Sequence, residues 1–169
     1  MTGTSLRRTP EPRSVLARTG APACPAYPRT VPARRRIETA AGVHALRQWA
    51  QAQDVVAGEG ATAAQASPAP ASLDRRTLAT AVRFTLEELA ACAPGHAVEV
   101  RVPPHGVTQA VSGTVHRRGT PPSVVETDAG TWLALATGRI DWAEALGSGA
   151  LHASGERCDL SPYLPLVRA

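Results

Sequence analysis

Lysine is absent from the chain, aromatic residues make up only 4% of it, and no long apolar run occurs. A membrane-spanning helix needs about 20 consecutive apolar residues, and a secretory signal needs a shorter apolar core near the N-terminus. The sequence shows neither. Its cysteines are three in number, lie far apart and form no CxxC pair, as is typical of a reducing compartment; they are Cys24, Cys92 and Cys158. These absences predict a cytoplasmic protein with no stable membrane insertion.

Motifs that hold metals, cofactors or catalytic groups are also missing. The histidines show neither HxxxH nor HExxH spacing, which a zinc site on a helix would need. The chain has no GxSxG nucleophile turn, no GxxxxGK[ST] phosphate loop and no GxGxxG followed by an acidic residue. Glu87 and Glu88 are adjacent on a predicted helix and point apart, so they are no acid/base pair. The sequence therefore predicts no metal, no cofactor and no catalysis.

The net charge of +4 is distributed unevenly. Residues 1–36 contain eight arginines and one glutamate, whereas residues 37–169 contain ten arginines and thirteen acidic residues. A nucleic-acid-binding domain needs basic charge on its folded surface, and the larger segment carries a small negative charge instead. We therefore expect no nucleic-acid partner. Six prolines and the lack of a periodic apolar face predict that residues 1–36 are a disordered basic tail.

The rest of the chain divides into a helix, a linker and a domain. Apolar residues at three- and four-residue spacing, from Val43 through Leu46 to Trp49 and Ala50, predict a helix within residues 37–56. Residues 57–71 are rich in alanine, glycine, proline and serine, which is typical of a linker. The main domain is expected over residues 72–169.

Within that domain, the apolar periodicity predicts a helix that begins after Ser72 or Asp74, a block of short strands and two further helices. The strands are expected at 98–102, 106–112, 114–117, 123–127 and 151–154. Asp128 and Asp141 are expected to cap the two short helices, the first of which ends at Gly138. Because the strands come in a block, the expected fold class is α+β, an antiparallel or mixed sheet of about four to five strands covered by helices.

The segment from Thr131 to Gly149 resembles the C-terminal signature of the sterol carrier protein family. In that signature a short helix ends in Leu-x-x-Gly-basic, and an aliphatic residue, a capped helix and Ser-Gly follow. Segments 82–90, 100–104 and 118–122 are similar to the bacterial, actinobacterial branch of the family. The chain departs from the family pattern at 159–165, where prolines replace a last strand of alternating apolar and basic residues. The signature positions are filled by Leu135, Gly138, Arg139, Ile140, Ala145, Ser148, Gly149 and Gly155.

The resemblance implies an apolar cavity between helices and sheet, and binding of lipid or fatty-acyl chains. The sequence leaves open whether the apolar side chains enclose a space or fill it. It also leaves open an accessory protein-interaction domain with a vestigial cavity, and it does not indicate the oligomeric state. His116–Arg118 is a candidate headgroup clamp or a solvated turn. The candidate cavity-lining residues are Phe84, Val107, Val111, Trp132, Leu135, Trp142, Leu146 and Leu151.

Domains of this family are also appended to enzymes, including thiol-dependent isomerases with a metal-binding helical bundle. This chain has one candidate helix in the corresponding position and no histidine cluster. We therefore interpret it as a non-catalytic module whose partner is an apolar small molecule.

Overall fold

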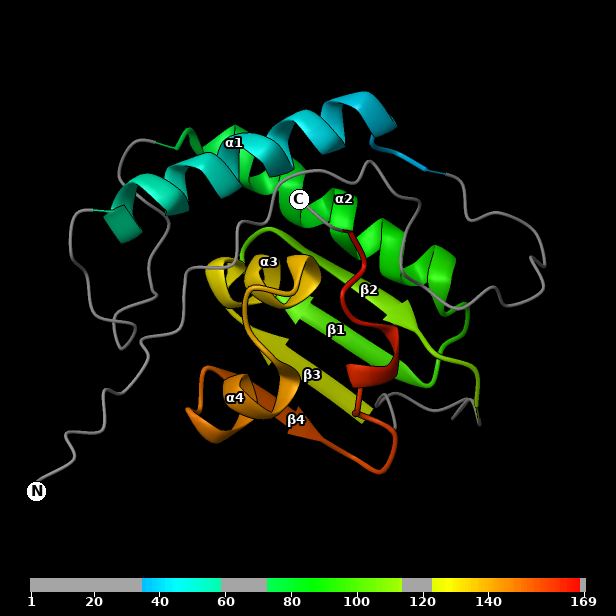
Figure 1. Cartoon of the computed structure of the whole chain (residues 1–169). Helices are drawn as coiled ribbons and strands as arrows, with labels where there is room; N and C mark the ends of the chain where they lie inside the picture. The colour runs from blue at the N-terminus through cyan, green and yellow to red at the C-terminus, as the bar shows by residue number, and fades with distance from the viewer. Residues whose placement is uncertain (1–34, 59–72, 114–122, 168–169) are drawn as a thin grey trace, which may run out of the picture.

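The computed structural model describes residues 35–58, 73–113 and 123–167 (Figure 1). Its elements follow in the order α1 (Thr39–Gly58), α2 (Arg75–Cys92), β1 (Val98–Val102), β2 (Gly106–Ala110), β3 (Ser123–Thr127), α3 (Ala129–Thr137), α4 (Trp142–Gly147), β4 (Leu151–Ser154) and a 3₁₀ turn, η2 (Ser161–Tyr163). None of the helices described is long and apolar enough to cross a bilayer.

The described strands form one mixed sheet of four strands in the order β2-β1-β3-β4. The outer pairs, β1–β2 and β3–β4, are antiparallel, and the central pair β1–β3 is parallel. The expected α+β class with a mixed sheet is therefore confirmed. The strand expected at 114–117 lies outside the described residues.

One face of the sheet is apolar and covered, and the other is polar. Along β1, Val98, Val100 and Val102 are fully buried, while Glu99 and Arg101 alternate with them on the outer face, where they form an ion pair of 2.6 Å. The helices α2 and α3 and the C-terminal segment lie over the inner face (Figure 1). The core therefore sits between these elements and the sheet, as the alternation predicts.

The helix ends follow the capping rules. Asp74 accepts a hydrogen bond from the Thr77 backbone N–H at the start of α2. Asp128 accepts from the backbone N–H groups of Gly130 and Thr131 at the start of α3. Gly138 ends α3 with φ +75°, a left-handed conformation that glycine adopts at little cost.

The N-terminal helix α1 lies beside α2, on the side away from the sheet (Figure 1). It spans Thr39–Gly58, against the expected 37–56, so the first residues of the expected linker belong to it. The folded region also includes Arg35 and Arg36, which were expected to belong to the tail. Residues 1–34 and 59–72, the rest of the expected tail and linker, lie outside the described residues.

Candidate functional site

Half of the predicted cavity-lining residues lie in the deep interior. Phe84, Trp132, Leu135 and Leu151 are each exposed by 1% or less. The indole N–H of Trp132 donates to the Thr85 hydroxyl at 2.8 Å, and that hydroxyl donates onward to the backbone of its own helix. These side chains are surrounded by protein, so a ligand that reaches them has to part elements that now pack together.

Two further predicted residues lie on α4 and remain partly in contact with solvent. Leu146 is 46% exposed, and Trp142, one helical turn earlier, is partly buried against the core. Ile140, just before the helix, is partly buried in the same way. These three apolar side chains, called here the α4 patch (Ile140, Trp142 and Leu146), lie on or just before α4, which is next to the edge strand β4 (Figure 1).

The helix α4 is weakly anchored in comparison with α3. Ala145 is its one buried residue, whereas six residues of α3 are buried. Asp141 occupies the expected N-cap position of α4, but its side chain makes no capping hydrogen bond. Gly147 ends α4 and Gly149 follows it, and a methyl group at either position would meet nothing within 4 Å. A displacement of α4 therefore breaks few contacts.

The last two predicted residues lie away from this patch. Val107 is 61% exposed, and because it pairs with Arg101 it faces outward on the polar side of the sheet. Val111 is partly buried just beyond β2, at the opposite edge of the sheet from β4, and has φ +64°. This left-handed conformation is rare for a β-branched residue. In this conformation the backbone of Val111 contacts the α2–β1 connection. The Val111 N–H donates to the Ala93 carbonyl at 2.7 Å.

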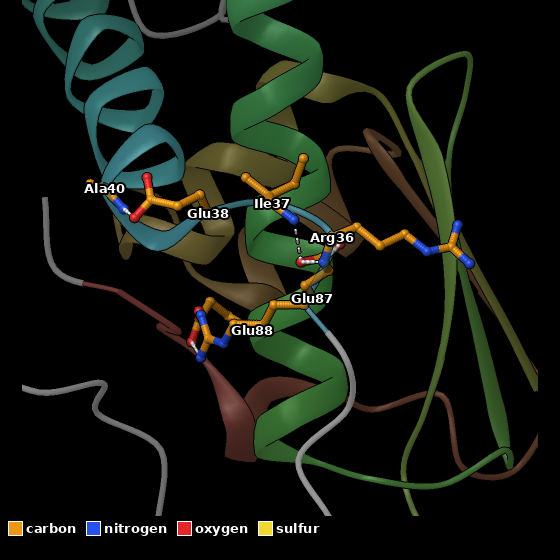
Figure 2. A network of polar contacts seen from close by, with 7 residues as sticks. Arg36, Ile37, Glu38, Ala40, Glu87 and Glu88 are labelled. Carbon is orange, nitrogen blue, oxygen red and sulfur yellow. Dashed lines mark hydrogen bonds and ion pairs between the residues drawn. The ribbon is translucent and has the colours of Figure 1, made fainter.

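A polar clamp joins the start of α1 to α2 (Figure 2). The Glu87 carboxylate accepts hydrogen bonds from the backbone N–H groups of Arg36 and Ile37 at 3.0–3.1 Å, and Glu88 pairs with Arg35. The two carboxylates thus point to different partners, as adjacent helical residues should. Glu38 completes the arrangement by capping the first turn of α1.

The middle of α1 makes an unusually close contact with α2. A Cβ atom at Gly42 would lie 2.2 Å from Cδ2 of Phe84, so only glycine fits there. Gly42 shares the buried face of α1 with Leu46 and Trp49, at i, i+4 and i+7. This contact was not predicted from the sequence, although a glycine within the apolar stripe of a helix is a signal of close approach.

The C-terminal half of α1 contacts the connection between α3 and α4. The guanidinium of Arg139 lies over the Trp49 ring, 5.6 Å from its centroid, a cation–π contact. Its Nη1 pairs with Asp54 at 2.8 Å, and its Nη2 donates to the Ala50 carbonyl at 3.3 Å. Arg139 therefore links α1 to the residues directly before the α4 patch.

The remaining polar candidates lie elsewhere. His105 lies in the β1–β2 turn, where burial, followed by the charges of Arg83 and Arg75, lowers its pKa below 6.5. His116–Arg118 lies outside the described residues. In the parts of the chain that the structure covers, no group of three His, Cys, Asp or Glu residues is placed to hold a metal.

The cysteines differ from one another. Cys158 is a free thiol that contacts the Gly155 carbonyl at 3.1 Å. Cys92 is disulfide-bonded, which departs from the reducing compartment that the sequence predicts. Cys24 lies outside the described residues.

The geometry defines a small α+β protein in which helices and a C-terminal segment cover one face of a mixed sheet and leave an apolar patch at one edge. Residues 74–166, more than half of the chain, match the family described as bacterial SCP ortholog, and the chain belongs to this family. The resemblance to the bacterial branch of the sterol carrier proteins is thereby confirmed. The match begins at the N-cap of α2, so α1 lies outside it. Among curated proteins, none matches the chain.

Proposed function

We propose that the protein binds the apolar chain of a lipid or fatty acyl molecule beneath α4, and that it catalyses no reaction itself. The observation that carries this proposal is the α4 patch: a partly exposed Trp142–Leu146 pair on the helix with the fewest buried residues in the domain. Membership of the SCP ortholog family supports the same class of ligand.

Entry beneath α4 is physically favourable because little has to be broken and much can be buried. α4 contacts β4, whose Leu151 is 1% exposed, and α3, which carries the buried Trp132 and Leu135, so we expect a displacement of α4 to open a way towards these side chains. Each methylene of an acyl chain that leaves water for such surroundings contributes about 0.8 kcal/mol. The apolar side chains of α4 can then cover the acyl chain that has entered beneath them.

The proposed site is narrower than the sequence predicts. It keeps Trp132, Leu135, Trp142, Leu146 and Leu151, and it omits Val107 and Val111 because they lie on the outer face and at the far edge of the sheet. Phe84 is also set apart, because its ring packs against Gly42 on α1. The cytoplasmic location remains a prediction.

Displacement of a fluorescent fatty acid from the full chain tests the proposal. We expect displacement by long-chain fatty acids at micromolar concentration, and about tenfold weaker binding in Leu146→Gln, because a polar side chain replaces roughly 1.5 kcal/mol of apolar contact. Val107→Gln is the matched control, since it makes the same kind of change at an exposed aliphatic residue outside the proposed site. Failure of every lipid to displace the dye would remove the proposal.

The accessory protein-interaction role has one observation in its favour, the dense burial of Phe84, Trp132, Leu135 and Leu151. In that role the α4 patch contacts a protein while the interior stays filled. Native mass spectrometry separates the two roles. Lipid that purifies with the chain supports the binding module, and a stable protein partner without lipid supports the accessory role.

A further inference from the structure

The two fully buried tryptophans differ in how their indole N–H groups are satisfied. The N–H of Trp132 donates to Thr85. Trp49 is 1% exposed, yet its Nε1–H has no hydrogen-bond partner, and among the described residues it is the one buried side-chain nitrogen or oxygen in that position. Buried polar groups are almost always hydrogen-bonded, so this unpaired one indicates an acceptor that the described residues do not supply.

An ordered buried water usually makes about three hydrogen bonds, but it would find no second unpaired side chain among the described residues. An amphipathic molecule can instead fill apolar surroundings with its body while its head oxygen accepts the indole hydrogen bond. The polar side chains already satisfied are Thr85, Glu88, Ser123, Thr127 and Thr131.

The position of Trp49 fits the head of a ligand whose chain lies beneath α4. Arg139 covers the Trp49 ring and precedes Trp142 by three residues, so the α3–α4 connection that leads to the α4 patch is in contact with α1 at Trp49. The guanidinium beside the ring is already paired with Asp54 at 2.8 Å, so its charge does not select an acidic head.

We propose that the indole N–H of Trp49 donates to the carboxyl or carbonyl oxygen of an amphipathic ligand, at the junction of α1 with the α3–α4 connection. This inference rests on the proposed function and specifies its ligand: an acyl chain with an acceptor head, as opposed to a plain hydrocarbon. It also gives α1, which lies outside the family match, a part in binding.

The test compares palmitic acid with hexadecane as competitors for a fluorescent fatty acid on the full chain. Trp49→Phe removes the N–H and keeps an aromatic ring. We expect this variant to bind palmitic acid about tenfold more weakly, the effect of one lost hydrogen bond, and to bind hexadecane as the unchanged chain does. Val55→Ala, on the exposed face of the same helix, is the control and should leave both affinities unchanged.

A second measurement uses the unchanged chain, so its result does not depend on the folding of a variant. In an NMR titration of the unchanged chain, the indole ¹H–¹⁵N resonance of Trp49 should move downfield with palmitic acid and stay in place with hexadecane. A static Trp49 resonance, or magnetisation transfer to it from a long-lived water that palmitic acid does not displace, would overturn the inference while binding beneath α4 still stood. Absence of binding by either competitor would instead remove the proposed function.

Discussion

The region of the family match, from α2 to the C-terminal segment, and the α1 region before it are held in place by different sets of contacts. The first supplies most of the core, in which the inward residues of the sheet meet α2 and α3. The second adds Ala45, Leu46, Trp49 and Ala50 to the same core. It is also attached by charged contacts at both ends, Glu87 and Glu88 at one and Arg139 at the other, with the glycine-dependent contact between them. Because most of the core residues lie in the first region, we expect that α1 can be loosened without dismantling the domain beneath it.

The largest effect is expected inside the domain, from Thr85→Val. This change leaves the N–H of Trp132 buried and unpaired, so the free energy of unfolding should fall by about 2 kcal/mol. Urea titration measures it, and both regions should unfold in the same weakened transition. Thr80→Val is the control, since the Thr80 hydroxyl donates only to its own helix, and it should change stability by less than about 0.5 kcal/mol. Equal effects of the two variants would contradict the role given to Thr85.

A smaller and more local effect is expected from Gly42→Ala. Alanine usually stabilises a helix relative to glycine by up to about 1 kcal/mol, but here its methyl group overlaps the Phe84 ring, and overpacking costs about 1–3 kcal/mol. Amide exchange in α1 should therefore accelerate, while protection in β1 and α3 is retained. Gly147→Ala, which meets no neighbour, should be neutral or slightly stabilising. Accelerated exchange in every element would show that the two regions cannot be separated.

The smallest effect concerns pH and belongs to the domain alone. Because burial and two arginines lower the pKa of His105, the unfolded chain takes up this proton more readily than the folded one. Stability from His105 is thus complete above pH 6.5 and declines as the pH falls below that value. Urea midpoints at pH 7 and pH 5 should show a slightly smaller loss in His105→Gln than in the unchanged chain. An equal loss in both would mean that other groups account for the decline.

Features set by neighbouring residues could be predicted from the sequence. Alternation placed the valines of β1 inside, and the Asp128–Gly138 pair fixed both ends of α3 because caps act through backbone groups within one turn. The order of the predicted strands and helices indicated the α+β class in the same way. Trp142 and Leu146 of α4 were identified as candidate lining residues, but their partial exposure was not predicted.

One local feature was missed although the sequence allowed its prediction. Val107 was expected in the interior, yet the tight β1–β2 turn pairs Val102 with Gly106 and so turns Val107 outward; counting residues from the turn would have shown this. Features that depend on distant residues, in contrast, could not be predicted. The contact of Trp49 with Arg139 joins residues 90 positions apart, and no local pattern encodes it. The unpaired indole N–H emerges only when every neighbour is in place.

The residues that α1 contacts lie far from it in the sequence, and this affects how the chain folds during synthesis. During synthesis α1 emerges first, but Glu87 follows about 50 residues later, and Arg139 is 85 residues beyond Asp54. Contacts between residues so far apart in the sequence form late in folding. The intervening chain loses conformational entropy first, and only then do these contacts offset that loss. The nascent helix therefore carries an uncovered apolar stripe, with Leu46 and Trp49 at its centre, until the rest of the domain has been translated.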